Sequence, residues 1–185
     1  MDVRQNQLSS VDDSIQLAPR LRTLLLGFNQ ITALDNLDGL AELCTLELAS
    51  NRLNDTHDLH LKVSQVSRLD LSDNKVRSLS GCAKMFSLTD LNVSGNKIGD
   101  LDSVFPVSNL PNLRCLNIQG NHVTTCVDYR IKVFESFGKR CSDLCLDNEL
   151  PTQQEVDKVS VLMALRVARE GKSPTSLFGN LPRRV

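Results

Sequence analysis

A pattern of aliphatic residues and asparagine recurs five times along the chain and limits the folds open to it. Each copy reads Leu-x-x-Leu-x-Leu-x-x-Asn-x-Ile, with Val or another aliphatic at some positions, and successive copies begin 22, 23, 22 and 25 residues apart. The copies begin at Leu21, Leu43, Val66, Leu88 and Leu113. A fixed period of this length is typical of repeat architectures, in which no unit is stable until its neighbours stack on it.

This pattern is the signature of leucine-rich repeats, and it predicts an α/β solenoid with 22–25-residue repeats and a parallel concave sheet. Each copy should form one short strand, turn at its asparagine and return along the outer side. The stacked asparagine side chains should hydrogen-bond backbone groups in the turns that would otherwise be buried without partners. We therefore assign structural roles to the five repeat asparagines and to Asn6, which stands in a preceding half repeat.

Three segments follow from where the pattern begins and ends. Residues 1–127 are the repeats, and the first repeat is truncated because Val3, Asn6 and Leu8 match only the second half of a copy. We therefore expect more protein upstream of this chain. Residues 128–172 should form a helical C-terminal cap, and residues 173–185 a tail that is either disordered or folded back.

The first cap helix should begin near residue 128. Its Tyr129, Val133, Phe134 and Phe137 are available to cover the open edge of the last repeat. After the last repeat asparagine the regular spacing is lost. This segment therefore closes the solenoid.

The second cap helix should start at Thr152-Gln153-Gln154-Glu155, which is a capping box. It should run to about Glu170 and end at Gly171, because glycine readily takes the left-handed conformation found after helix ends. The helix carries a broad apolar stripe. That stripe either docks on the first cap helix or receives a partner.

The repeat register predicts which side chains face a partner. In Leu-x-x-Leu-x-Leu the aliphatics point inward, so the third and fifth positions project from the concave sheet and the eighth lies at its rim. We predict that the binding residues on this face are Leu25, Phe28, Glu47, Arg68, Asp70, Asp73, Asp90, Asn92 and Asn117.

Two features stand out among these residues. Leu25 and Phe28 form an exposed apolar pair, and a buried aromatic anchor often supplies much of the energy of a protein contact. An acidic band, made of Glu47, Asp70, Asp73 and Asp90 with Arg68 inside it, would steer a basic partner. The alternative is that this band is only a solvated face. The residues after the repeat asparagines add a basic edge that includes Arg52, Lys75 and Lys97.

Net charge and the positions of the histidines and cysteines argue against nucleic-acid binding, catalysis and metal binding. A formal net charge of −1 argues against a general nucleic-acid binder, and we expect no such partner. Neither His57, His60 nor His122 has a neighbour at the spacing of a catalytic triad or metal site, so we expect no catalytic residues, metal or cofactor. The six cysteines should be free thiols. Cys141 and Cys145, one helical turn apart, have no second ligand pair for zinc.

The C-terminal part of the chain resembles the nischarin family. The resemblance rests on Asp-Tyr-Arg-Ile-Lys-Val at residues 128–133, Phe-Gly-Lys-Arg at 137–140 and Glu-Val-Asp-Lys-Val at 155–159. The repeats before them, with the long insertion at 103–111, are similar in order and length. Intracellular repeat proteins of the phosphatase-regulator and axonemal-dynein types share such repeats, so the cap motifs are the discriminating part. The polar segment at 56–60 departs from the vertebrate pattern, which indicates a distant relative.

The resemblance implies a non-enzymatic scaffold that binds Rac-type and Rab-type small GTPases, p21-activated kinase or related kinases, and thereby regulates cell migration and endosomal trafficking. It implies a cytoplasmic protein that is peripheral on endosomes. Membrane contact would come only from an upstream phosphoinositide-binding PX domain, which is missing here. The alternative is a regulatory or targeting subunit of a protein phosphatase or motor complex.

Overall fold

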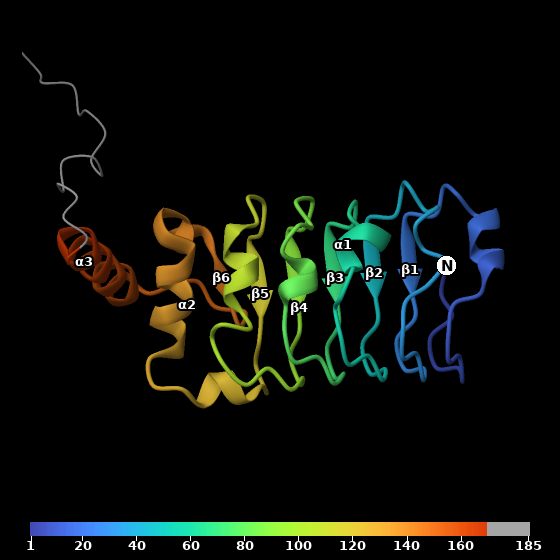
Figure 1. The fold of residues 1–185 in the computed structure, drawn as a ribbon, viewed down its shortest axis with the longest axis horizontal. Helices are drawn as coiled ribbons and strands as arrows, with labels where there is room; N and C mark the ends of the chain where they lie inside the picture. The colour runs from blue at the N-terminus through green and yellow to red at the C-terminus, as the bar shows by residue number, and fades with distance from the viewer. Residues whose placement is uncertain (170–185) are drawn as a thin grey trace, which may run out of the picture.

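The computed structural model describes residues 1–169, which form an elongated stack of repeats closed at one end by helices (Figure 1). The expected helix end at Gly171 and the tail at 173–185 lie outside the described residues. Along the stack the chain advances by one strand per repeat. The first residues lie at the end opposite the helices.

A parallel sheet of six short strands runs the length of the stack, with the strands in sequence order. The strands are β1 (Thr23–Leu25), β2 (Thr45–Glu47), β3 (Arg68–Asp70), β4 (Asp90–Asn92), β5 (Cys115–Asn117) and β6 (Cys145–Leu146). Asp2 adds a parallel bridge to Leu25 at the outer side of β1. The leucine-rich repeat solenoid predicted from the repeat period is therefore confirmed.

The middle leucines of the strands are aligned across the whole sheet and form the centre of the core. Leu24 is the register partner of Leu46, and the same column continues through Leu69, Leu91, Leu116 and Leu146. All six are at most 2% exposed. Each buried leucine contributes roughly 1.5–3 kcal/mol relative to an exposed one. The stability of the stack therefore depends on neighbouring repeats remaining in contact.

Short helical segments form the outer side of the repeats. They are the 3-10 helices Asp13–Leu17, Ser80–Cys82 and Phe105–Asn109, together with α1 (Leu59–Lys62). A further 3-10 helix, His122–Thr125, follows the turn at Asn121. One point of close packing lies on this side, where a Cβ on Gly81 would collide with the backbone carbonyl oxygen of Thr56. Only glycine fits there without a shift of the backbone.

The repeat asparagines form the buried ladder that the sequence predicts. Asn74 shows the pattern: its Nδ2 donates to the carbonyl oxygens of Leu48, Leu71 and Ser72 at 2.9, 3.1 and 3.0 Å, and its Oδ1 accepts from the Leu53 amide at 2.9 Å. Each of the five repeat asparagines is at most 8% exposed. Asn6 is exposed and bonds only two nearby carbonyls, so its role is weaker.

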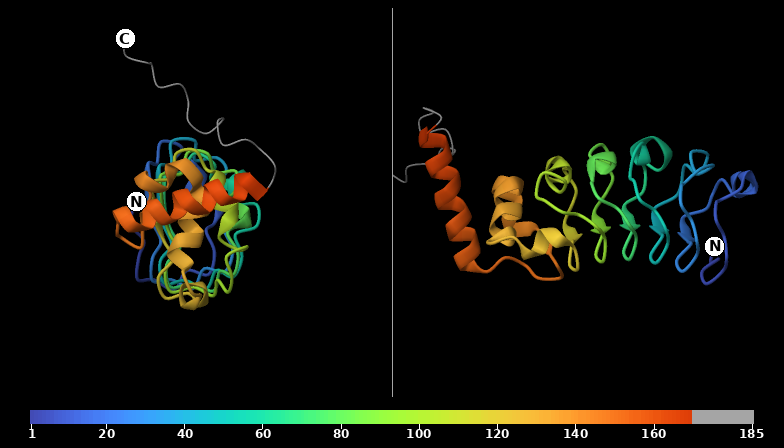
Figure 2. Two further views of the ribbon diagram at one scale, coloured as in Figure 1. Left: turned by 90° about the vertical axis from the view of Figure 1, so that its left-hand side faces the viewer. Right: turned by 60° about the horizontal axis from the view of Figure 1, so that its bottom comes forward.

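Two helices cover the end of the stack, as Figure 2 shows. In α2 (Tyr129–Phe137), the side chains of Val133, Phe134 and Phe137 are buried against the last repeat, as expected. Arg140 holds the following 3-10 helix (Gly138–Asp143) against the segment just before the fifth copy, because its guanidinium donates to three carbonyl oxygens within residues 108–111.

The second helix, α3 (Gln153–Arg169), packs on α2. Its start has the predicted capping box, in which the Thr152 amide donates to Glu155 Oε2 at 2.8 Å and the Glu155 amide donates to Thr152 Oγ1 at 3.3 Å. Glu155 also accepts from Arg130 Nε at 2.8 Å. Val159 is 1% exposed against the cap, so the apolar stripe docks on α2 along part of its length.

The segment between the two cap helices contains a strand, although the sequence indicates a helical cap there. The repeat pattern ends with the fifth copy, but Leu146 aligns with Leu116 and extends the sheet. Cys141 and Cys145 are not one helical turn apart, because Cys141 belongs to a 3-10 helix and Cys145 to β6. The strand is short because the chain turns away at Asp147, whose backbone φ is +57°.

Asp147 ends the sheet by a side-chain contact. Its Oδ1 accepts from the Ile118 amide at 2.8 Å, whereas in the preceding repeats the amide at this position donates to a strand carbonyl. Its Oδ2 accepts from the Tyr129 hydroxyl at 2.8 Å. Burial, together with this hydrogen bond, raises the pKa of Tyr129 to about 12. The carboxylate thus connects the last complete repeat to the cap.

Candidate protein-binding surface

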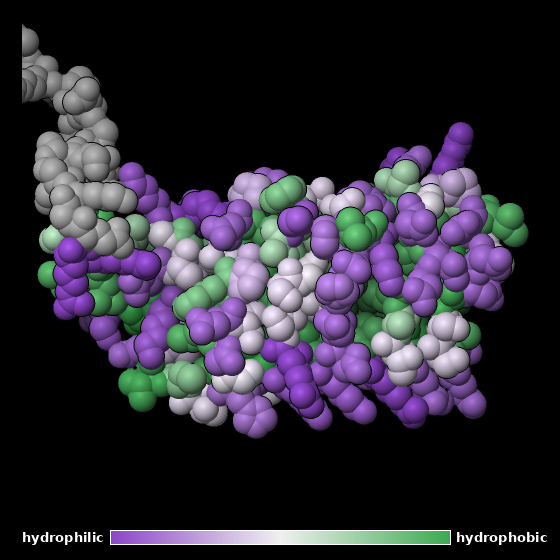
Figure 3. All heavy atoms as spheres, in the orientation of Figure 1, coloured by the Kyte–Doolittle hydropathy of each residue, from purple (hydrophilic) through white to green (hydrophobic). Residues whose placement is uncertain are grey.

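The side chains at the third and fifth repeat positions lie on one face of the sheet and line a groove of about 410 Å³. The alternation of side chains along each strand puts them there, because the residues between them point into the core. The groove is lined mainly by Thr45, Glu47, Arg68, Asp70, Asp90, Asn92, Cys115, Asn117, Cys145 and Asn148. The opposite face, which carries the short helical segments, is the one drawn in Figure 3, and hydrophilic side chains cover most of it with smaller apolar areas between them.

Six of the nine predicted binding residues line this groove, namely Glu47, Arg68, Asp70, Asp90, Asn92 and Asn117. The other three lie outside it. Leu25 is half-buried on β1, at the N-terminal end of the sheet. Phe28 and Asp73 are exposed in the turns that follow β1 and β3. The structure therefore brings the polar part of the predicted surface together and leaves Phe28 at its rim.

The inward and outward assignment of the first full repeat is confirmed. Leu24 and Leu26 are 0% and 1% exposed, whereas Phe28 is 54% exposed. Leu25 points to the opposite face from its two neighbours but is only partly accessible. The apolar pair expected near the N-terminal end thus consists mainly of Phe28.

Phe28 has an unusual backbone conformation for an aromatic residue. Its φ is +57°, and every eighth repeat position is left-handed in the same way. The other residues at this position are Gln5, Ser50, Asp73, Gly95 and Gly120. The left-handed region costs a residue with a Cβ roughly 1–2 kcal/mol, and bulky side chains are rare there. The turn requires this geometry, and Phe28 adopts it at a conformational cost while 54% of the residue stays exposed.

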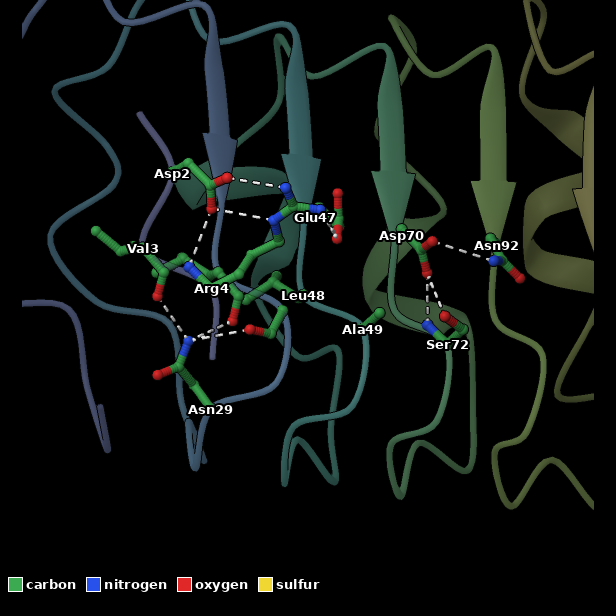
Figure 4. Close-up of polar contacts among 12 residues, drawn as sticks. Asp2, Val3, Arg4, Asn29, Glu47, Leu48, Ala49, Asp70, Ser72 and Asn92 are labelled. Atoms are coloured by element: carbon green, nitrogen blue, oxygen red, sulfur yellow. Dashed lines mark hydrogen bonds and ion pairs between the residues drawn. The ribbon is translucent and has the colours of Figure 1, made fainter. Parts of the chain in front are cut away.

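Hydrogen bonds hold the polar side chains of the groove in place, as Figure 4 shows. Asp70 Oδ1 accepts from the amide and hydroxyl of Ser72 at 2.8 and 2.6 Å, and its Oδ2 accepts from Asn92 Nδ2 at 3.2 Å. Asn92 Oδ1 in turn accepts from the amide and hydroxyl of Ser94. These side chains are already oriented in the free domain, so binding a partner costs little of their conformational entropy.

Cations reduce the charge of the acidic band at two places. Arg68 Nε lies 3.7 Å from Asp90 Oδ2, as expected from the sequence. Arg4 was not among the predicted residues, yet its guanidinium pairs with Asp2 at 2.8 Å and lies 3.8 Å from Glu47 Oε1. Hydrogen bonds from the Arg4 side chain and amide lower the pKa of Asp2 to about 2. The seventh repeat position of Arg4, which faces the rim, is the signal that identifies it.

The basic edge forms a separate surface. Lys75, Arg77 and Lys97 line one polar hollow together with Asn54, Asp55 and Ser78, while Arg52 does not belong to it. Within residues 1–169 no group of three or more His, Cys, Asp or Glu side chains is arranged to hold a metal ion. No helix in that range is both long and apolar enough to cross a membrane.

The repeat sequence, the parallel sheet and the asparagine ladder together define a leucine-rich repeat domain. Two family models agree: one described as Leucine rich repeat matches residues 41–98, and one described as Leucine Rich repeats (2 copies) matches residues 86–130. Domains of this class are in general interaction modules without catalytic activity, and neither model indicates a catalytic family.

Among known proteins, the chain is similar to acidic leucine-rich nuclear phosphoprotein 32 family member A of Drosophila melanogaster. The two are 37% identical over 75 residues, which are 40% of this chain and 29% of the relative. The chain therefore matches less than a third of that protein. The match identifies the kind of repeat and does not single out nischarin.

Three solved structures share the fold. An internalin from Listeria monocytogenes has a TM-score of 0.64 and 23% identity over 80% of this chain and 40% of its own. The Drosophila melanogaster SNF/U2A′ complex has a TM-score of 0.55 and 20% identity, and the match covers 91% of this chain and 86% of the other. The TLR13–ssRNA13 complex has a TM-score of 0.60 and 23% identity, and the match covers 66% of this chain and 18% of the other. At these identities the likeness concerns the fold alone.

Proposed function

We propose that the concave face of this domain binds a protein with a basic surface, and that Phe28 is the apolar anchor of the contact. The observation that carries the proposal is Phe28 itself, an aromatic side chain that is 54% exposed and sits in a left-handed turn. Strained backbone conformations concentrate at binding and catalytic sites, because selection for function retains them. Aromatic side chains that become buried in a protein contact often supply much of its binding energy.

The acidic band supplies the second part of the contact. Asp70 has hydrogen-bond partners in Ser72 and Asn92 and no cation within ion-pair distance among residues 1–169, so its charge is only partly offset. Asp73 is exposed beside it. Such a band attracts a basic surface and speeds encounter more than it tightens the complex. Phe28 should therefore control dissociation, and the acids should control association.

We further propose that the chain is part of a nischarin-like scaffold in the cytoplasm and on endosomes. Its partners on this proposal are Rac-type or Rab-type small GTPases, or p21-activated and related kinases. What supports it is the resemblance of the cap motifs at residues 128–133 and 155–159. A scaffold needs an extended, pre-oriented surface, and the groove along β2–β6 supplies one.

The test is a binding measurement of this chain with GTP-loaded Rac-type and Rab-type GTPases, with p21-activated kinase, and with a phosphatase catalytic subunit. The Phe28→Gly variant should raise Kd at least about thirtyfold for the true partner, which corresponds to about 2 kcal/mol for a central anchor. It should not lose stability, because glycine relieves the left-handed strain. Asp73→Asn should slow association at low ionic strength and leave dissociation unchanged.

Two controls separate anchor loss from other effects. Phe86→Ala removes an aromatic side chain that is 57% exposed but is not among the predicted binding residues, and it should leave Kd unchanged. Ser50→Gly relieves the left-handed backbone strain at the equivalent position of the next repeat and removes no aromatic side chain. If Phe28→Gly binds as well as these controls, the anchor assignment is wrong. Binding to the phosphatase subunit alone would replace the GTPase or kinase assignment with the regulatory-subunit alternative.

A further inference from the structure

Two thiols lie side by side on the floor of the concave groove. Cys115 of β5 and Cys145 of β6 are register partners at the third repeat position, and both line the groove and are half-buried. Aligned residues on neighbouring strands have Cα atoms about 4.8 Å apart. Disulfides join Cα atoms that are roughly 4.4–6.8 Å apart. The two side chains also leave the sheet on the same face, so the pair is within reach of a disulfide.

The other cysteines of the chain are not placed in this way. Cys44 is exposed, Cys126 is half-buried directly after the 3-10 helix His122–Thr125, and Cys82 and Cys141 are buried. None of these four is the register partner of another cysteine in the sheet of residues 1–169. The arrangement at Cys115 and Cys145 is therefore a property of that pair and not of cysteine content.

We propose that Cys115 and Cys145 form a dithiol site that reacts with small disulfides, such as oxidised glutathione, and closes into a reversible disulfide between β5 and β6. One cysteine thiolate attacks the small disulfide and forms a mixed disulfide, which releases one glutathione thiolate. The other cysteine thiolate then attacks the protein sulfur of the mixed disulfide and releases the second. The two protons lost by the protein go to the released thiolates, so the protein is oxidised by two electrons and oxidised glutathione is reduced to two thiols.

The strand geometry makes this bond easy to break again. Disulfides favour a Cβ–Cβ separation of about 3.8 Å, which is shorter than the spacing of aligned residues on parallel strands. Closure therefore draws β6 towards β5, and the resulting strain makes the bond easier to reduce. β6 has two residues and is the last strand of the sheet, and the 2.8 Å hydrogen bond from the Ile118 amide to Asp147 Oδ1 resists its displacement.

The surroundings of the pair set its reaction rate. Burial raises the pKa of Cys115 to about 11, and the Asp90 carboxylate and the Cys145 thiol beside it contribute. Arg68, which lies 3.7 Å from Asp90, only partly offsets that negative charge. Because the thiolate is the attacking species, closure should be slow near neutral pH and about tenfold faster for each pH unit until the pKa is approached. Asp90→Asn should speed closure near neutral pH.

The experiment treats the whole chain with oxidised glutathione at about pH 7 and about pH 9, followed by intact mass measurement and mapping of disulfide-linked peptides. We expect a loss of two hydrogens, a single linkage between Cys115 and Cys145, faster closure at the higher pH, and reversal by reduced glutathione. Exposed Cys44 should carry only a glutathione adduct. Cys44→Ser should leave closure unchanged.

Variants of the pair show whether both thiols take part. Cys115→Ser and Cys145→Ser should each stop at the glutathione adduct on the remaining cysteine of the pair. In the unmodified chain, a stable adduct at Cys115 or Cys145, a linkage between any other two cysteines, or no reaction at this pair would each overturn the proposal. Peptide mapping of the unmodified chain decides the outcome even if a variant folds poorly. The closure does not depend on which partner the concave face binds.

Discussion

Replacing Asn74 with alanine should test whether the asparagine ladder stabilises the stack through one particular backbone group. The side chain contacts four groups, but three of them keep another partner after the change. The carbonyl oxygen of Leu48 still accepts from Asn51, that of Leu71 from Asn96, and that of Ser72 from the backbone of residue 50. The amide of Leu53 loses the one acceptor that the structure shows for it.

The expected loss of stability follows from the one hydrogen bond that is not replaced. A buried backbone donor left without a partner costs about 1–3 kcal/mol, and the three weakened carbonyl contacts add to it. Asn74→Ala should therefore lower the free energy of unfolding by about 2–3 kcal/mol. Asn6→Ala is the matched control, because Asn6 has the same repeat position but is exposed, and its effect should stay within about 0.5 kcal/mol.

Urea unfolding of the two variants measures the difference, and amide hydrogen exchange locates it. The Leu53 amide should lose protection in Asn74→Ala while the amides of the more distant strands keep theirs. If the two variants lost equal stability, or if the Leu53 amide stayed protected, the account of the ladder as the acceptor for buried amides would be refuted.

Three further outcomes can be measured. Gly81→Ala should cost about 1–3 kcal/mol because no room exists for its Cβ, whereas Gly99→Ala, which faces open space, should change the unfolding free energy little. Tyr129 is the only tyrosine, so ultraviolet titration of the folded chain should give a midpoint at about 12, and stability should fall as the pH rises from the ordinary value of 10 towards 12. The hydrogen bond from Arg130 lowers the pKa of Glu155, so their contact should stabilise the fold fully above pH 4.5, the ordinary pKa of a glutamate. This stabilisation should be lost as the pH falls through the lower pKa of the folded state. Hydrogen exchange in α3 should show the loss in the parent chain and not in Arg130→Met.

Much of the fold follows from local sequence rules. The alternation along Leu24, Leu25 and Leu26 decides which side chain faces the core, because neighbouring residues of a strand point to opposite faces. The capping box at Thr152 and Glu155 marks a helix start for an equally local reason. The predicted register and helix start are confirmed because both depend on spacings within one repeat or one helical turn.

The features missed depend on contacts between distant segments. Nothing around Cys145 and Leu146 repeats the full aliphatic pattern, so a sixth strand becomes visible only when the segment lies beside β5. The pairing of Cys145 with Cys115 depends on that strand and could not be foreseen. The repeat position of Arg4 places it at the rim, but its contacts with Asp2 and Glu47 depend on the reach of its side chain, which spacing does not give.

The turn after β6 has a consequence for assembly. Leu146 uses both its amide and its carbonyl oxygen to pair with Glu149, so the backbone at the outer side of the last strand is already occupied. An exposed strand edge is a template on which other chains can add strands, and proteins avoid uncontrolled polymer growth by covering it. The hairpin at Leu146 therefore blocks end-to-end elongation of the sheet from the capped end of the molecule.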